Sequence, residues 1–246
     1  MMKDSHPSVW GPRPRLGLGE QARTLAGQTA QRLRQDIIHN RLAPSERLTF
    51  DKLSKLYGVG SSPIREALFQ VVAEGLVVAE DHKGFIVAPI NFGEMIDVSR
   101  LRAHLETFAV AESIRQGDED WETRILTAQH RLRRVSEQLR GSDAPDEEAK
   151  NEWEGRHRAL HHSLCSACGS PWTLHFFDVL YDQLERYRRY FWKYTERAVG
   201  ADREHDEIVE AALARDEALA VSLLKAHFKR QAELTIATQK AVQAAA

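Results

Sequence analysis

Two histidines, His157 and His161, stand four residues apart in a stretch whose apolar pattern predicts a helix. Side chains at this spacing leave a helix on the same face, roughly 6 Å apart. Neutral imidazoles so placed are a common two-ligand platform for a divalent ion. His205 and His227 lie on two later predicted helices, and histidines that face one another inside a helical bundle build a metal centre. The pair formed by His157 and His161 predicts a site for one divalent ion, with zinc favoured and nickel or another transition metal as alternatives.

The residues around this set limit its chemistry. Metal binding needs neutral imidazoles, so the affinity is expected to fall as pH drops through about 6.5. His162 points about 100° away from His161 around the helix and is left out of the predicted site. A zinc protease carries its general base between its two histidines, but positions 158–160 hold Arg, Ala and Leu. No nucleophile constellation accompanies the histidines, so a metal-dependent hydrolase is disfavoured and the chain is not expected to be an enzyme.

Cys165 and Cys168 continue the same helical stripe. A redox Cys-x-x-Cys pair normally opens a helix, whose N-terminus lowers the thiol pKa, whereas this pair closes one. We therefore expect two small buried core residues and keep redox sensing as an alternative. Two cysteines in 246 residues also suit a reducing cytoplasm, and no apolar segment near the N-terminus resembles a signal peptide.

Two arginines of the predicted bundle are candidates for binding a small organic acid. Arg102 lies on its first helix and Arg186 on its fourth. A guanidinium clamps a carboxylate through two hydrogen bonds, while a metal with open positions takes the remaining oxygens. Surface salt bridges are the alternative for most of the group formed by Arg186, Arg188 and Arg189.

The elements that must position these residues form two parts. The chain is 42% apolar and 28% charged, which is ordinary for a globular protein, and its apolar runs are too short to span a membrane. Residues 1–20 are rich in proline and glycine and predict a flexible tail. The first 90 residues carry 12 Lys and Arg against 9 Asp and Glu, and the remainder carries 22 against 27. A basic front would suit a module that binds a polyanion.

Residues 21–90 predict a winged helix-turn-helix. Apolar residues at helical spacing place a helix from Ala26 to near Asn40. A second helix over 51–57 should bury Leu53 and Leu56 and end at Gly58, and a third should begin with Ser62 as its cap. The runs 76–79 and 85–88 flank a turn and predict a β-hairpin.

Residues 91–246 predict an all-α antiparallel bundle. Helical patterns over 93–115, 119–140, 146–168, 171–196, 200–214 and 216–241 are separated by short loops. The chain is therefore mostly helical, with its strands confined to the front part.

In the winged part, the start of the third helix supplies the candidate DNA contacts. A recognition helix presents its first residues to the major groove. Arg65 suits a bidentate contact to guanine, and the hydroxyls of Ser61 and Ser62 suit phosphate contacts. Lys52 precedes this helix, and His82 and Lys83 at the hairpin turn suit backbone or minor-groove contacts. The alternative is a winged fold used for protein contacts.

Four runs of this part carry a specific signature. They are Arg41-Leu-Ala-Pro-Ser-Glu-Arg-Leu48, Leu53-Ser-Lys-Leu-Tyr-Gly-Val-Gly60, Ser62-Pro-Ile-Arg-Glu-Ala-Leu68 and Glu74-Gly-Leu-Val77. They resemble the DNA-binding domain of the GntR family over residues from about 25 to 90. Many members carry arginine two residues before the proline, where this chain has Ser61. A major base contact of those relatives is therefore absent, and their operator sequence does not transfer.

A second signature covers residues from about 93 to 241. It includes Arg102-Ala-His-Leu-Glu106, Trp153, His157, Leu160-His161, Gly169-Ser-Pro171, Glu204-His205-Asp-Glu-Ile-Val-Glu-Ala-Ala212 and His227. These residues resemble the FCD effector domain of the FadR subfamily, with features of a CsiR-like branch. The resemblance implies histidine metal ligands at His161, His205 and His227. The position of His157 is usually Asp or Asn in the family, so an all-histidine site would be softer and less anionic.

These patterns and resemblances together predict a ligand-responsive transcriptional regulator. The resemblance implies a homodimer on a palindromic DNA operator, with one recognition helix for each half-site. A small carboxylate held at the metal would shift the domain arrangement and therefore the affinity for DNA.

Overall fold

The chain folds into two compact units joined by continuous chain. The computed structural model describes residues 24–80, 84–140, 146–191 and 201–244, so the predicted tail over 1–20 lies outside the described residues. Of these residues, those from 24 to 35 and from 47 to 86 form the first unit, and those from 36 to 46 and from 87 onward form the second. None of the described helices is both long and apolar enough to cross a membrane.

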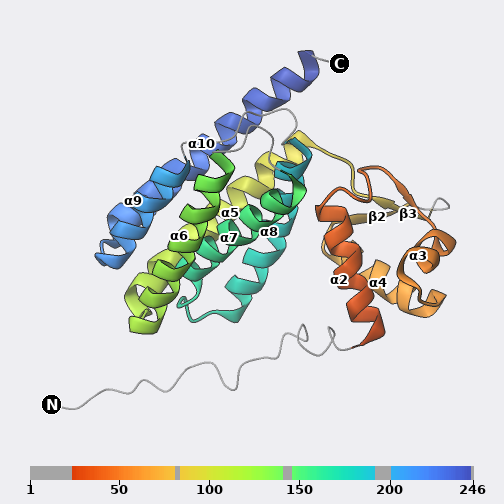
Figure 1. Ribbon diagram of the computed structural model, residues 1–246, viewed down its shortest axis with the longest axis horizontal. Coiled ribbons are helices and arrows are strands. Elements are labelled where there is room, and N and C mark those ends of the chain that lie inside the picture. The colour runs from red at the N-terminus through yellow and green to blue at the C-terminus, as the bar shows by residue number, and fades with distance from the viewer. Residues whose placement is uncertain (1–23, 81–83, 141–145, 192–200, 245–246) are drawn as a thin grey trace. The chain divides into compact units, whose positions relative to one another are not determined.

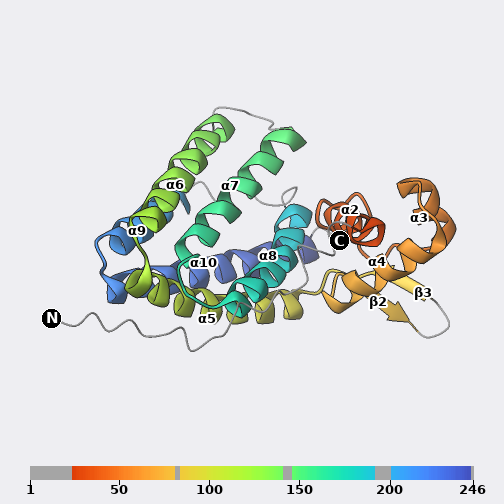
Figure 2. The ribbon, with the colours of Figure 1, turned by 90° about the horizontal axis from the view of Figure 1, so that it is seen from below.

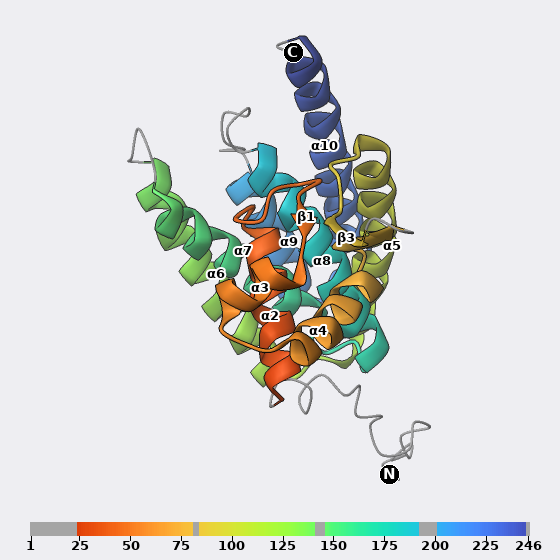
Figure 3. The ribbon, with the colours of Figure 1, turned by 90° about the vertical axis from the view of Figure 1, so that its right-hand side faces the viewer.

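The front part has the winged helix-turn-helix architecture that the sequence predicts (Figure 3). Its described elements are α2 (Leu25–Ile38), β1 (Arg47–Leu48), α3 (Phe50–Tyr57), α4 (Ser61–Ala73), β2 (Val77–Glu80) and β3 (Gly84–Val87). The sheet has the order β1-β3-β2, and β1 runs antiparallel to β3 with Arg47 opposite Ile86. The two-residue strand β1 was not expected, because two residues are too few to show an alternating pattern.

Helix α3 begins and ends where its capping residues place it. Thr49 accepts a hydrogen bond from the backbone N–H of Lys52 at 3.2 Å, and Gly58 closes the helix with a left-handed φ of 68°. Leu53 is fully buried, as expected. Leu56 is 48% exposed, so its expected burial is wrong. Tyr57 takes the second core position of this helix instead.

The candidate recognition helix α4 starts one residue earlier than its expected cap. Gly60 is the N-cap and makes no side-chain capping bond, so the expected capping role of Ser62 is wrong. Pro63 still lies in the first turn, where backbone N–H groups have no partner within the helix. The expected buried face is confirmed at Ile64, Ala67, Leu68 and Val71.

The second unit is the helical bundle that the sequence predicts (Figure 1). Its described helices are α5 (Phe92–Gln116), α6 (Glu119–Arg140), α7 (Glu147–Cys165), α8 (Pro171–Phe191), α9 (Ala201–Leu213) and α10 (Glu217–Ala244). Helices α6 and α7 pack side by side, and α5 packs against both α8 and α10 (Figure 2). The core between them contains Trp121, Leu160, Tyr181, Ile208 and Leu224. The candidate metal ligands on α7, α9 and α10 lie within this packed interior.

The contrast within α3 gives a stability test. Leu53→Ala should lower the free energy of unfolding by about 2–5 kcal/mol, because it leaves a cavity in a filled core. Leu56→Ala is the matched control and should change it by less than about 1 kcal/mol, because its side chain is already solvated. Urea denaturation followed by circular dichroism measures both. Equal losses in the two variants would contradict the burial assigned to this helix.

Candidate functional site

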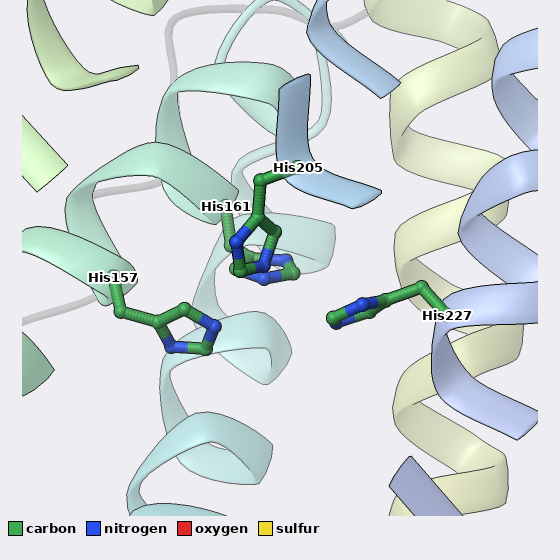
Figure 4. A group of neighbouring side chains, drawn as sticks. All are labelled: His157, His161, His205 and His227. Atoms are coloured by element: carbon green, nitrogen blue, oxygen red, sulfur yellow. The ribbon is translucent and has the colours of Figure 1, made fainter. Parts of the chain in front are cut away.

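The four predicted histidines meet inside the bundle. His157 and His161 come from α7, His205 from α9 and His227 from α10, and their rings point toward one another (Figure 4). One ring nitrogen from each of the four lies within 4.8 Å of the others. All four side chains are buried, with at most 6% of their surface exposed. The sequence therefore identified a cluster that tertiary packing assembles from three helices.

Three of the four rings are oriented by a hydrogen bond at Nδ1. The Nδ1 of His157 lies 2.6 Å from the hydroxyl of Tyr181, and that of His161 lies 2.8 Å from a carboxylate oxygen of Glu106. The Nδ1 of His227 lies 2.9 Å from a carboxylate oxygen of Glu204. Metal-binding histidines usually have such a partner on the nitrogen that does not bind the ion, because it fixes the tautomer and ring direction.

Three ring nitrogens of the cluster lack a hydrogen-bond partner among the described residues. Nε2 of His161 and both ring nitrogens of His205 are buried without a hydrogen bond among the described residues. An unsatisfied buried nitrogen costs about 1–3 kcal/mol. A divalent cation would satisfy Nε2 of His161 and one ring nitrogen of His205 together. The arrangement fits a metal site, although the residues do not fix which ion it takes.

Burial lowers the pKa of three of these histidines, His157, His161 and His205. Burial lowers the pKa of His161 to about 4, with Arg102 and His227 acting in the same direction and Glu106 opposing them. Burial and the neighbouring histidines also hold the pKa of His157 and of His205 well below the usual value. These rings are therefore neutral at physiological pH, as a ligand must be.

Glu106 is the ionised group at the edge of the cluster. Burial would raise the pKa of this carboxyl, but Arg102 and His161 outweigh that effect and lower it to about 2. The Nε of Arg102 donates to Oε1 of Glu106, while Oε2 contacts His161. The carboxylate thus joins α5 to α7 directly beside the metal-binding nitrogens.

Arg102, a predicted ligand contact, is partly occupied by this internal pair. Its guanidinium lies 4.5 Å from the ring centroid of Tyr181 and 5.4 Å from that of Phe228. Its Nη2 is buried without a hydrogen-bond partner among the described residues. This nitrogen therefore remains for a bound anion, whereas Nε is taken by Glu106.

Arg186, the second predicted ligand contact, has a different partner. Its Nη1 donates to the backbone carbonyl of Ala88 at 2.6 Å, and its guanidinium lies 4.8 Å from the ring centroid of Tyr187. The side chain is fully buried, and this burial lowers its pKa. A surface salt bridge, the alternative considered for Arg186, is therefore wrong.

The neighbouring arginines do form ion pairs. Arg188 donates to both carboxylate oxygens of Glu154 at 3.0 and 2.8 Å, and Arg189 donates to Glu185 at 2.7 Å. Glu154 and Glu185 are both buried, so these pairs are more sheltered than the expected surface pairs.

The two cysteines are buried core residues, as expected. Cys165 and Cys168 are free thiols, and Cys165 is fully buried in the cluster that contains Leu160 and Leu164. Burial raises the pKa of both thiols, which disfavours the thiolate needed for redox chemistry.

The predicted DNA contacts cluster at the start of α4. Ser61, Ser62 and Arg65 are exposed there, and Lys52 is exposed on α3. The guanidinium of Arg65 lies 5.2 Å from the ring centroid of Phe50, and the hydroxyl of Ser62 donates to Glu66 at 3.3 Å. His82 and Lys83, at the hairpin turn, lie outside the described residues.

Sequence reasoning missed the residues that orient the histidines. Glu106 carries a signal, because it follows Arg102 by one helical turn and such pairs are often ion pairs. Glu204 directly precedes His205 but serves His227 on another helix. Tyr181 had no signal, since only the packing of α8 against α7 brings it to His157.

Comparison with known proteins supports this division into two parts. Residues 25–87 match the family of bacterial regulatory proteins called the gntR family, and residues 97–230 match the FCD domain. The chain is 37% identical over 207 residues to the uncharacterized HTH-type transcriptional regulator BphR of Paraburkholderia xenovorans, covering 84% of this chain and 83% of that protein. It is 35% identical over 199 residues to the HTH-type transcriptional repressor GlaR of Escherichia coli, covering 79% and 88%.

Solved structures show the same fold. The structure titled E. coli McbR/YncC matches with a TM-score of 0.73 at 16% identity, over 88% of this chain and 99% of that one. A putative GntR transcriptional regulator from Rhodococcus sp. RHA1 matches with a TM-score of 0.71 at 18% identity, over 86% and 97%. The match extends across both compact units.

The metal site has a direct test. His161→Ala removes one ligand and should lower the affinity for zinc by more than about 100-fold, since even the loss of an outer partner costs 10- to 100-fold. His162→Ala, one residue away, is the matched control and should retain the metal. Metal content is measured by mass spectrometry after zinc loading and gel filtration. Equal zinc in wild type and His161→Ala, or none in wild type, would return the histidines to a purely structural role.

The buried neutral histidines also predict how stability depends on pH. Between about pH 4 and 6.5 the unfolded chain binds a proton at His161 that the folded, metal-free protein does not. The free energy of unfolding should therefore fall as the pH is lowered through this window, by about 3 kcal/mol from His161 alone. Urea denaturation of metal-free protein at several pH values measures the slope. His161→Ala should make this slope shallower, and His162→Ala should leave it unchanged. An unchanged slope in both variants would contradict the lowered pKa of His161.

Proposed function

The chain belongs to the GntR family of bacterial regulatory proteins and carries an FCD domain, so it is a DNA-binding transcriptional regulator, and we propose that a small carboxylate bound at a metal in the bundle controls it. The observation that carries this proposal is the buried cluster of four histidines in the second unit. A site of this kind has no role in contacting DNA, whereas it suits the recognition of an effector.

The charges around the cluster favour an anionic effector. A divalent ion would add two positive charges to that of Arg102. Glu106 offsets one charge, and Glu204, which contacts His227, is already paired with Arg230. A carboxylate would supply the missing negative charge and accept a hydrogen bond from the unpaired Nη2 of Arg102. Four histidine nitrogens would complete the coordination sphere of a tetrahedral ion. Binding of a carboxylate to the metal therefore needs an ion that accepts five or six ligands. Arg102, and not Arg186, is therefore the arginine that we assign to the effector.

Helix α8 offers a route from the effector site to the DNA-binding part. Tyr181 on this helix contacts His157, and one and a half turns later Arg186 contacts the carbonyl of Ala88. Tyr187 also donates to Glu94 at 3.1 Å. Ala88 directly follows β3 in the chain, so a shift of α8 would act on the segment that leaves the winged unit. An effector alters DNA affinity only if it binds the two arrangements of this segment unequally.

We propose that the winged part spans residues 21–90 and binds DNA through α4. Ser61, Ser62 and Arg65 would contact the major groove, with Lys52, His82 and Lys83 supporting contacts to the backbone or minor groove. One small module gives limited affinity, so we propose a homodimer that places one α4 in each half of a palindromic operator. Residues 91–246 would then serve effector binding and dimer formation.

The test begins with an operator selected from random DNA by the full-length protein. Arg65→Ala should weaken operator binding by about 1–3 kcal/mol and relax the preference at one base pair, because a bidentate base contact is lost. Lys52→Ala is the comparison variant and should weaken all sequences alike while lowering the salt dependence by about one charge. Gel shifts at several salt concentrations measure both. Wild-type binding by Arg65→Ala would show that α4 is docked differently.

Gel shifts also distinguish the response to the effector from DNA binding itself. A thermal-shift screen of organic acids, without metal and with added zinc or nickel, identifies an acid that stabilises the metal-loaded protein. That acid should change operator affinity of the wild type and leave the affinity of His161→Ala unchanged, while both proteins bind DNA alike without it. A wild type that responds to diamide and to no acid would instead favour sensing through the cysteines.

A further inference from the structure

Helix α5 presents a second pattern on the side that faces away from the histidines. Its buried face carries Arg102 and Glu106, whereas Leu101 and Phe108 are 56% and 55% exposed. These two residues belong to a longer stripe with alternating steps of four and three, made of Asp97, Leu101, His104, Phe108, Ala111 and Arg115. Such spacing is the seam by which one helix packs along another. None of the six is classed as buried within this chain, and Ala111 alone is half-buried.

The stripe is complementary to itself when it is reversed. Two copies of α5 that run antiparallel, with a two-fold axis midway between His104 and Phe108, place Asp97 opposite Arg115 of the other copy. The same operation places Leu101 opposite Ala111, and His104 opposite Phe108. A large apolar residue thus meets a small one, and opposite charges meet at both ends. A parallel arrangement would place each charge opposite its own kind.

We propose that α5 pairs antiparallel with α5 of a second copy and forms the centre of the homodimer interface. This inference rests on the dimer proposed above and names the surface that forms it. Helix α5 lies along an edge of the bundle, as Figures 2 and 3 both show, so its stripe is accessible to another chain. Neighbouring α8 packs against α5 and exposes two more large aromatic residues, Trp172 and Phe176. An interface centred on α5 can therefore extend beyond one pair of helices.

The end charges set the direction of pairing more than its strength. Arg115 already donates to Glu217 and Glu112 of its own chain, so Asp97 of the other copy would join an existing cluster of charges. Exposed ion pairs contribute little to affinity, whereas apolar side chains that become buried contribute more. The affinity is therefore assigned to Leu101 and Phe108, and the antiparallel direction to Asp97 and Arg115.

Disulfide formation in the full-length protein tests the pairing and its direction. Two residues form a disulfide only when their Cα atoms lie within about 7 Å. The double variant Leu101→Cys with Ala111→Cys should give a covalent dimer on mild oxidation, because each new thiol faces its counterpart in the other chain. Each single variant should remain uncrosslinked, since like positions are ten residues apart along the antiparallel pair. Native Cys165 and Cys168 are buried, and any crosslinking that they cause is measured with the wild type.

Light scattering at micromolar concentration completes the test. Wild type should be a dimer, and Phe108→Asp should be a monomer that still retains bound zinc and helical circular dichroism. Leu126→Asp is the matched control, because Leu126 is 51% exposed on α6 and should leave the dimer intact. Efficient crosslinking of the single variants would overturn the antiparallel pairing. A dimeric Phe108→Asp without crosslinking in the double variant would overturn this surface alone, whereas a monomeric wild type on operator DNA would overturn the proposed dimer as well.

Discussion

The bundle depends on one buried ionised carboxylate. Glu106 on α5 accepts from Arg102 on the same helix and contacts His161 on α7, with both acid and arginine almost fully enclosed. Removing Arg102 would leave the buried carboxylate without its counter-charge, and removing Glu106 would leave the buried guanidinium without its own. This constraint fixes the position of α5 against α7 and points one imidazole at the other three. The same carboxylate therefore contributes both to the packing of α5 against α7 and to the direction of the candidate metal-ligand nitrogens.

Much of the fold is predictable because it is specified locally. The helices of the bundle follow from apolar spacing and from the glycine, proline and aspartate residues at their ends, and Gly58 ends α3 as expected. The exceptions lie where tertiary packing decides. Leu56 fits the apolar pattern of α3, but the neighbouring elements cover Tyr57 instead. Strand β1 exists only because β3 offers it an edge, which no pattern of two residues can show.

The candidate site divides in the same way. The spacing of His157 and His161 revealed the first pair, and the family resemblance supplied His205 and His227 from helices far along the chain. The partners of these residues depend on which helices become neighbours. Arg102 and Arg186 have the same chemistry in the sequence, yet one lies beside Glu106 and the other at the carbonyl of Ala88. Residue type predicts what a side chain can bind, and packing decides what it meets.

Enclosure of the four imidazoles also affects how quickly the site can exchange its ion. Because the nitrogens from α7, α9 and α10 are buried together, an ion enters or leaves only when a helix moves away, and such local opening is slow compared with diffusion. An ion acquired during folding would then persist over many cycles of effector binding. In kinetic terms such an ion would belong to the architecture of the receptor, and the proposed organic acid would be the component whose concentration the protein senses.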